Sequence, residues 1–210
     1  MFVNLNTRSY YSLLSTNLSV SEIIDFAVKN NQTHVCLTDL NVLYGAVEFY
    51  NLAKKNHLIP IIGLEIFDHS TNSELVLIAK NNSGYLNLIK ISSFASSNLE
   101  FDLFKYLDEN LFVIVKSGDF KWDHVNCLKK KELAFNFVNC YDLEKKVGLN
   151  VINAVSMKQA GKRSKFQIDE LYNSQLVLAS PFLSTEKAKK QFSQKQLDRL
   201  NDLVQQCSGW

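Results

Sequence analysis

The feature of this chain that most limits its fold is an alternation of short apolar segments with amphipathic ones. Four short apolar segments have the length and composition of buried strands: HVCLTDL (34–40), LIPIIGLEIF (58–67), ELVLIAK (74–80) and LFVIVKS (111–117). The segments around them have apolar residues at helical spacing: 18–30, 45–56 and 83–94. Strands that are apolar throughout and alternate with helices indicate a parallel sheet covered by helices, so we expect an α/β fold.

Local signals support two of these helices. Ser19 and Glu22 have the spacing of a capping box at the start of the first helix. That helix is expected to bury its periodic apolar residues: Val20, Ile23, Ile24, Ala27 and Val28. The second is expected to face inward with the following: Ala46, Val47, Tyr50 and Ala53.

The second half of the chain is less regular. Its pattern predicts a strand over 132–139, a short helix over 142–148 ended by Gly148, a strand over 150–156 and a helix over 165–174. A single longer helix is predicted over 183–207, with an apolar face made of these residues: Phe192, Leu197, Leu200, Leu203 and Val204. The sequence has neither a repeat nor a low-complexity linker, and residues 1–210 are therefore expected to form a single domain.

Composition and charge are those of a soluble globular protein. Hydrophobic residues make up 46% and charged residues 21%, with a formal net charge of +2. The lysine runs at 129–131 and 187–190 could contact phosphates, but we favour solvated faces. Four widely spaced cysteines predict free thiols rather than a zinc site. Without a signal peptide or a long apolar stretch, we expect a cytoplasmic protein with no membrane partner.

Polar side chains at the ends of predicted strands are the candidate functional residues. They are the Asn6–Arg8 run, Asp39, Glu65, Glu74 and Ser156. Because the carboxyl ends of parallel strands converge, these residues could line one crevice. Asp39, Glu65 and Glu74 are the carboxylates that could bind a divalent metal, whereas the four histidines are expected to be non-ligands.

Arg8 is the unusual member of this set because its charge is permanent. Its guanidinium could bind a phosphate. We favour the alternative that Arg8 pairs with Asp39, Glu65 or Glu74 in a buried ion network, because a buried charge needs such a partner.

Several segments resemble, in order, the PHP (polymerase and histidinol phosphatase) domain of bacterial replicative DNA polymerase III alpha subunits. They are FVNLNTRSYYSLLS (2–15), the stretch from LTDLNVLYG to IIGLEIF (37–67) and LVLIAKNNSGYLNLIKIS (75–92), followed by NVINAVSMKQ (150–159) and FLSTEKAKKQF with LNDLVQQC (182–207). The resemblance implies a distorted (β/α)7-type barrel of parallel strands with outer helices. The stretch between Gly118 and Val151 is shorter than in the family, so the barrel is expected to be reduced in the middle.

Active members of this family bind up to three metal ions at the strand ends, and the resemblance locates those ligand positions here. Asn6 and Arg8 occupy the positions of the family's HxH pair, and Ser15 that of a following Asp. The remaining positions fall on Leu40 in TDLNVLYG, Glu65 in GLE, Glu74, and Ala154 with Ser156 in NAVS. Only Glu65 keeps the expected ligand, with Asp39 beside it. The resemblance therefore implies a vestigial site with no metal and no catalytic residue.

The expected function follows from this resemblance. The chain would be the amino-terminal part of a longer DNA-directed DNA polymerase and would act as a non-catalytic scaffold. It would dock the rest of the alpha subunit, and a proofreading exonuclease or another replisome subunit is a further candidate; DNA would be met through the parent chain. Two alternatives remain open. One is a residual phosphoesterase or 3′–5′ exonuclease that uses Mg, Mn or Zn at Asp39, Glu65 and Glu74, and the other is an independent small protein.

Overall fold

The computed structural model describes residues 2–13, 15–97, 102–141 and 180–207. Along the chain they form β1 (Asn6–Thr7), α1 (Val20–Lys29), β2 (His34–Leu40), α2 (Ala46–Lys55), β3 (Ile59–Asp68), β4 (Ser73–Ala79), α3 (Asn82–Ser97), η1 (Leu103–Tyr106), β5 (Leu111–Ser117), β6 (Cys127–Lys129), η2 (Lys130–Glu132), β7 (Phe137–Val138), α6 (Thr185–Gln191) and α7 (Gln194–Gln206). No helix in these ranges is long and apolar enough to cross a membrane.

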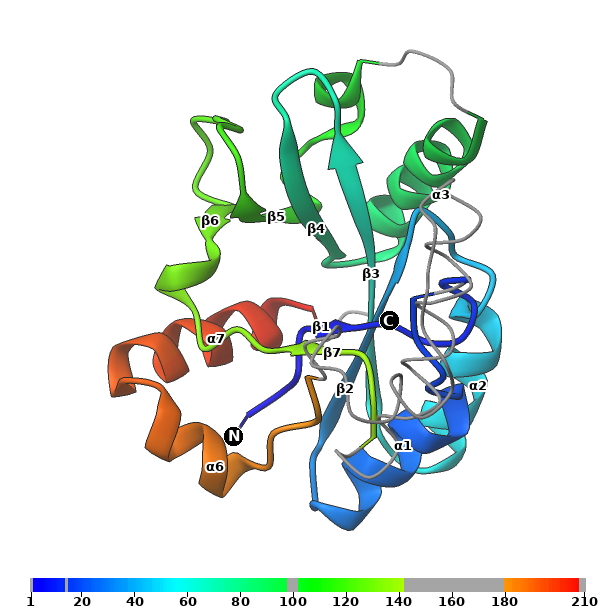
Figure 1. The fold of residues 1–210 in the computed structure, drawn as a ribbon, viewed down its shortest axis with the longest axis vertical. Coiled ribbons are helices and arrows are strands. Elements are labelled where there is room, and N and C mark those ends of the chain that lie inside the picture. The colour runs from blue at the N-terminus through cyan, green and yellow to red at the C-terminus, as the bar shows by residue number, and fades with distance from the viewer. Residues whose placement is uncertain (1, 14, 98–101, 142–179, 208–210) are drawn as a thin grey trace, which may run out of the picture.

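Five strands form the main sheet in the order β2-β3-β4-β5-β6, and β1 pairs with β7 separately (Figure 1). The β1–β7, β2–β3 and β5–β6 pairs are parallel, as predicted. The prediction was wrong for β4, which runs antiparallel to both β3 and β5. Only residues 69–72 separate β3 from β4, and a hairpin that short can join only antiparallel strands. The sheet is therefore mixed.

Side chains alternate between the two faces of this sheet, and each face buries a separate core. On one face, α1 and α2 pack on β2 and β3, and α3 packs on β3, β4 and β5. On the other face, the amino-terminal segment and α7 cover the following strand residues: Cys36, Ile61, Val76, Ile78, Phe112 and Ile114. We call this second face the inner face. Figure 1 shows α7 and α2 on opposite sides of the sheet.

Side chains, not backbone ladders, join the short β1–β7 pair to the main sheet. The Asn6 side-chain amide donates to Thr38 Oγ1 at 3.1 Å, and Thr38 Oγ1 donates to the carbonyl of Thr7 at 3.3 Å. The Cys36 thiol donates to the carbonyl of Leu5 at 3.2 Å. The end of β1 is thereby held against the inner face of β2.

The carboxy-terminal helix differs from its prediction. Residues 183–207 form two helices, α6 and α7, that break at Phe192 and Ser193. Ser193 begins α7 with a capping box to Gln196, and this local hydrogen bonding favours a new helix start over continuation. The predicted apolar residues of α7 are buried: Leu197, Leu200, Leu203 and Val204.

Of the remaining predictions of local structure, some are confirmed and others are wrong. The Ser19–Glu22 capping box is confirmed. In α2, Ala46 and Ala53 are buried as predicted, but Phe49 is the buried residue between them and Val47 is 66% exposed, because residues 46, 49 and 53 share one helical face. The predicted strand over 132–139 is reduced to β7. Within the described ranges, none of the four cysteines forms a disulfide, as predicted. The elements predicted over 142–148, 150–156 and 165–174 lie outside the described residues.

Candidate functional site

Strand geometry places Glu65 near the carboxyl end of β3, on the inner face of the sheet. Ile61, Gly63 and Glu65 alternate toward that face, and Leu40 at the end of β2 is the neighbour of Glu65 in register. Gly63 allows this close packing, because a Cβ there would lie 2.5 Å from the carbonyl oxygen of Leu77 on β4. Gly63, two residues before Glu65, is thus required because the backbones of β3 and β4 approach too closely there for a side chain.

Two cations bind the Glu65 carboxylate. Arg8, just after β1, donates from Nε to Glu65 Oε2 at 2.8 Å, and Lys116 of β5 donates to Oε1. Asn6 adds a hydrogen bond to Oε2 at 2.9 Å. Both carboxylate oxygens are therefore bonded to protein donors, and the side chain of Glu65 is only 2% exposed.

The ring of Phe137, on β7, completes this group. The guanidinium carbon of Arg8 lies 4.9 Å from the ring centroid, and the ammonium nitrogen of Lys116 lies 5.0 Å from it. Both distances are in the range of a cation–π attraction. We call Arg8, Glu65, Lys116 and Phe137 the ion cluster. It confirms the expected pairing of Arg8 with a strand-end carboxylate.

The charges of the ion cluster keep Glu65 ionised. Burial by itself would raise the pKa of Glu65, because a low-dielectric environment disfavours the charged form. The hydrogen bond and charge of Arg8, together with the charge of Lys116, outweigh burial and lower the pKa below its ordinary value. Glu65 is therefore a charged structural group at neutral pH, and three protein donors already bind its two oxygens.

Asp39 is held apart from the ion cluster. Residue 39 alternates with Thr38 and therefore points away from the inner face. Its carboxylate accepts hydrogen bonds from the backbone N–H and hydroxyl of Ser9, and from Ser12 Oγ at 2.7 Å. Burial nevertheless raises the pKa of Asp39, against the lowering effect of these hydrogen bonds and of Arg8. Asp39 is a support for the 9–12 loop, and the prediction that it shares one crevice with Glu65 and Glu74 was wrong.

Glu74 lies at the exposed edge of the ion cluster, and the remaining predicted site residues lie away from it. Glu74 Oε2 is 4.0 Å from Lys116 Nζ, with the Glu74 side chain 51% exposed. Ser15 Oγ donates to the carbonyl of Ser12. Leu40 donates its backbone N–H to Ser12 Oγ at 2.8 Å and offers no side-chain ligand. Ala154 and Ser156 lie outside the described residues.

These residues do not fit a metal cluster of the kind described above for active members of the resembled family. In the described ranges no three His, Cys, Asp or Glu side chains are grouped so that they could hold one ion. The single central carboxylate, Glu65, already faces two cations, which would repel a divalent ion. The arrangement can bury and neutralise charge, but it offers neither a nucleophile nor an open coordination position.

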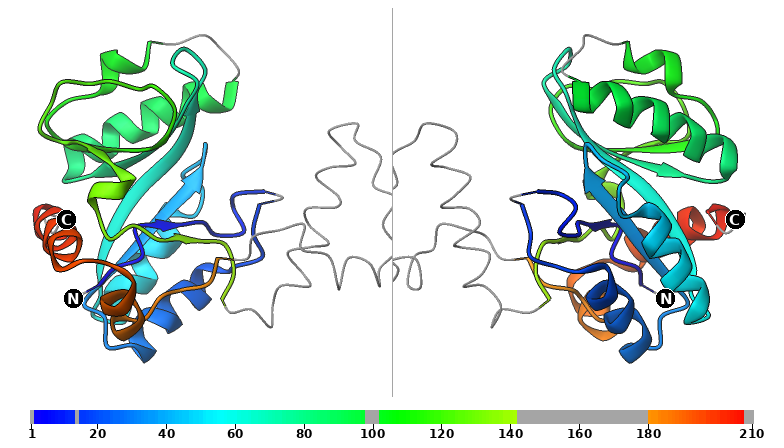
Figure 2. Two further views of the ribbon diagram at one scale, coloured as in Figure 1. Left: turned by 60° about the vertical axis from the view of Figure 1, so that its left-hand side comes forward. Right: turned by 90° about the vertical axis from the view of Figure 1, so that its right-hand side faces the viewer.

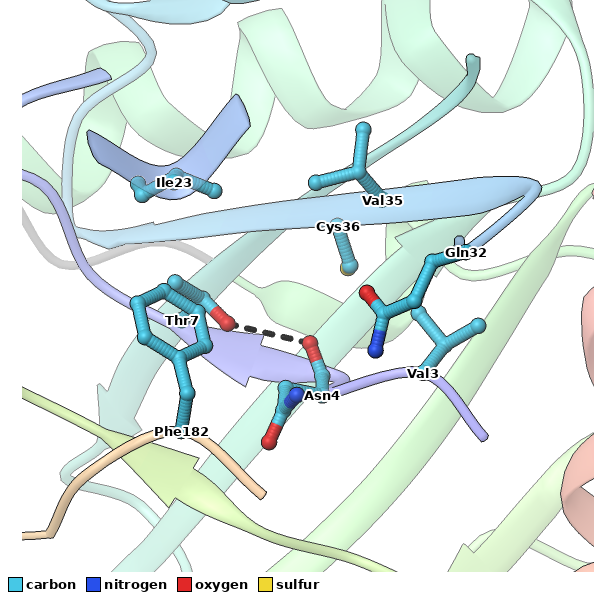
Figure 3. Close-up of a pocket in the computed structure, with 8 residues that line it drawn as sticks. All are labelled: Val3, Asn4, Thr7, Ile23, Gln32, Val35, Cys36 and Phe182. Carbon is cyan, nitrogen blue, oxygen red and sulfur yellow. Dashed lines mark hydrogen bonds between the residues drawn. The ribbon is translucent and has the colours of Figure 1, made fainter. Parts of the chain in front are cut away.

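A small cavity of about 10 Å³ lies between β1, β2, α1 and the segment before α6 (Figure 3). Its lining includes Thr7 of the predicted Asn6–Arg8 run, together with Gln32, Cys36 and Phe182. Such a volume is about the room that one water molecule needs. The cavity is therefore too small to be a substrate site.

Sequence reasoning missed Lys116 and Phe137. The alternation along β5 contained the signal for Lys116, because Phe112 and Ile114 are inner-face residues and residue 116 follows at the same period. Phe137 could not be found this way, because it reaches the site through β7, which was predicted as part of a longer strand. Ser12, which binds both Asp39 and the backbone of Leu40, was also missed.

Comparison with known proteins matches residues 4–117, more than half of the chain, to the PHP domain model. DNA polymerase III subunit alpha of Ureaplasma parvum is 41% identical over 165 residues, which cover 79% of this chain and 15% of that relative. The Mycoplasma genitalium subunit is 34% identical over 99% of this chain and 26% of its own length. The chain thus spans between 15% and 26% of these relatives. Among solved structures, a putative metal-dependent phosphoesterase from Bifidobacterium adolescentis matches 42% of this chain and 32% of its own, with 14% identity and a TM-score of 0.34. The chain belongs to the PHP domain family.

Proposed function

We propose that this chain is the PHP module of a DNA polymerase III alpha subunit and acts there as a structural scaffold without a metal site. The whole subunit would be a DNA-directed DNA polymerase, and the partner of this module would be the rest of that subunit. Two such subunits support the assignment, because they match 79% and 99% of this chain. The ion cluster at Glu65 is the observation that supports the scaffold role.

Electrostatics explains why the ion cluster and a metal site exclude each other. A divalent ion would have to displace Arg8 and Lys116 from Glu65 and would then remain close to the positive charges of both side chains. Removing a buried cation from its partner leaves an unpaired buried charge, which costs about 3–5 kcal/mol. One carboxylate cannot offset that cost, since divalent ions are ordinarily held by several oxygen or nitrogen ligands.

We further propose that the inner face belongs to a reduced PHP barrel. The β1–β7 pair lies against β2 through side-chain hydrogen bonds, and the loop from β6 through η2 leads directly to β7. The chain thereby returns from the β6 edge of the main sheet to its β2 edge. The ion cluster spans the inner face, because its residues come from the β1–β7 pair and from the interior strands β3 and β5.

Metal content tests the scaffold role. The purified chain would be incubated with MnCl2 or ZnCl2, passed through a desalting column and analysed for bound metal. We expect far less than one equivalent per chain, and no difference between the unaltered chain and Glu65→Ala.

One equivalent or more of tightly held metal that is lost in Glu65→Ala would overturn the proposal. Together with hydrolysis of a phosphodiester by the loaded chain, that result would establish the alternative, a residual phosphoesterase or exonuclease. Circular dichroism of Glu65→Ala would verify that the variant is folded before its metal content is compared.

A further inference from the structure

Two lysine runs that are far apart in the sequence lie on the same side of the molecule. Lys129 ends β6, and Lys130 and Lys131 lie in η2. The second run, 187–190, lies in α6, and Lys195 lies near the start of α7. Gln196 of α7 donates its side-chain amide to the carbonyl of Lys131 at 3.0 Å, and Ala134 N–H donates to the carbonyl of Gln196 at 3.1 Å. Figures 1 and 2 show η2, α6 and α7 together on this side.

This side holds more positive charge than the whole chain. Residues 129–132 and 184–206 contain eight of the 23 Lys and Arg residues but only four of the 21 Asp and Glu residues. Their formal charge is therefore +4, and the rest of the chain carries −2. The nearly neutral total of the chain therefore includes a local excess of positive charge in these two segments.

The lysines of this side are exposed and unpaired. Within the described ranges, the single ion pair here is Arg199 with Glu132, at 3.6 Å. No carboxylate in that part of the chain pairs with Lys129–Lys131, Lys187, Lys190 or Lys195, which we call the lysine face. In the ion cluster, by contrast, a buried carboxylate binds the two cations. The lysine face therefore gathers six exposed lysines that no described carboxylate neutralises.

The fold holds the lysine face in place. α7 buries Leu197, Leu200, Leu203 and Val204 against the inner-face core, and its polar side is thereby turned outward. Capping serines at 184 and 193 begin α6 and α7. The lysines thus stand on a short, docked helix pair and on η2, not on a free tail.

We propose that the lysine face binds the phosphate backbone of duplex DNA, without reading its sequence. Lysine ammonium groups recognise phosphates as point charges, and the release of counterions from a polyanion favours such binding. An anionic membrane is a poorer match: none of the exposed large apolar side chains falls in 129–132 or 184–206, whereas a surface-bound helix inserts apolar residues. This inference does not depend on whether the ion cluster excludes metal.

The test compares two triple variants that change net charge equally. The first, Lys131→Gln/Lys187→Gln/Lys190→Gln, neutralises three lysines of the lysine face. The control, Lys55→Gln/Lys90→Gln/Lys105→Gln, neutralises three exposed lysines elsewhere. Binding of the full chain to a fluorescent 20-base-pair duplex of mixed sequence is measured by anisotropy between about 20 and 150 mM NaCl.

We expect the unaltered chain to bind the duplex with an affinity that falls steeply with salt. Each lost phosphate contact lowers the slope of log K against log[salt] by about 0.9. The lysine-face variant should therefore lose about 2 to 3 from that slope and more than tenfold in affinity at the lowest salt. The control should stay within about twofold of the unaltered chain.

Three results would overturn the proposal. Equal losses in both triple variants would show that net charge alone drives binding. An unaltered chain without salt-dependent binding would show that the lysine face is only solvated. Tighter binding to an acidic peptide of matched charge than to the duplex would assign the surface to an acidic protein partner instead.

Discussion

Replacing Arg8 by Met is the sharpest perturbation of the ion cluster. Methionine keeps an unbranched side chain of similar length but removes the charge and every donor. Glu65 would lose the 2.8 Å bond to Arg8 and would keep Lys116 and the Asn6 amide. The Glu65 carboxylate, whose side chain is 2% exposed, would stay buried with one cation fewer, so part of its desolvation cost would no longer be offset.

The magnitude follows from burial and from the remaining partners. Removing one member of a buried pair costs about 3–5 kcal/mol when the other is left alone. Because Glu65 retains a second cation, we expect Arg8→Met to lower the free energy of unfolding by about 3 kcal/mol, at the lower end of that range. Lys116→Met should behave similarly, since its side chain is as well buried as that of Arg8.

Urea denaturation followed by circular dichroism measures these changes. Arg199→Met is the matched control, because Arg199 pairs with Glu132 at 3.6 Å with side chains 43% and 35% exposed. Exposed pairs of this kind contribute about 0–1 kcal/mol. The Arg8→Met/Lys116→Met double variant should lose more than the sum of the single variants, because only then is Glu65 without a cation.

Two outcomes would refute this reasoning. An unfolding midpoint of Arg8→Met equal to that of the control would mean that the Arg8–Glu65 pair does not support the fold. Strict additivity in the double variant would mean that Arg8 and Lys116 do not share Glu65 as a common partner. A triple variant that adds Glu65→Leu should recover much of the lost stability, as apolar replacements of buried ion groups often do.

Two further predictions concern pH and the 9–12 loop. Because the folded-state pKa of Glu65 is lowered, its ionised carboxylate contributes fully to stability above its unfolded pKa of about 4.3, and this contribution is lost as the pH falls below that value. In Arg8→Met the free energy of unfolding should therefore fall less steeply with decreasing pH than in the unaltered chain. An unchanged slope would contradict this. Ser12→Ala removes the 2.7 Å bond to Asp39 and the acceptor for the Leu40 N–H, and it should cost about 1–3 kcal/mol in thermal or urea unfolding, whereas Ser15→Ala, which breaks one bond to a carbonyl, should cost about 1 kcal/mol or less.

Much of the fold could be predicted because it depends on local patterns. The strands β2, β3, β4 and β5 and the helices α1, α2 and α3 lie where apolar runs and helical spacing indicated them. The direction of β4 could not be inferred from apolarity, since both parallel and antiparallel strands can be buried on two faces; the short connection at 69–72 was the available signal. The break between α6 and α7 was likewise present in the sequence, as Ser193 followed by Gln196, but the continuous apolar spacing concealed it.

The site was predictable to the extent that it depends on strand alternation. The strand-end pattern predicts that Arg8 pairs with Asp39, Glu65 or Glu74, and the structure pairs it with Glu65. Asp39 was wrongly placed in one crevice with Glu65, because the prediction relied only on the position of each residue near a strand end. It did not consider that residue 39 alternates with Thr38 along β2 and so points away from the inner face. Lys116 was missed for the same reason, although counting by twos from Phe112 reaches it. Phe137 depends on long-range pairing of β1 with β7, which no local pattern specifies.

The ion cluster has a topological consequence that the separate contacts do not reveal. Among the described strands, backbone hydrogen bonds join β1 to β7 and not to the main sheet, so the attachment of this pair to that sheet depends on side chains. Neutral hydrogen bonds from Asn6 and Cys36 contribute about 1 kcal/mol each. The Arg8–Glu65 pair joins β1 to β3, and Phe137 of β7 lies against both cations, so that β5 is joined through Lys116.

Loss of the ion cluster should therefore detach the β1–β7 pair before the β2–β5 sheet unfolds. In Arg8→Met, hydrogen exchange should accelerate at the Arg8 amide, which donates to Val138, while amides of β4 remain protected. Equal acceleration in both regions would show that the two sheets unfold as one unit and that the ion cluster is not their junction.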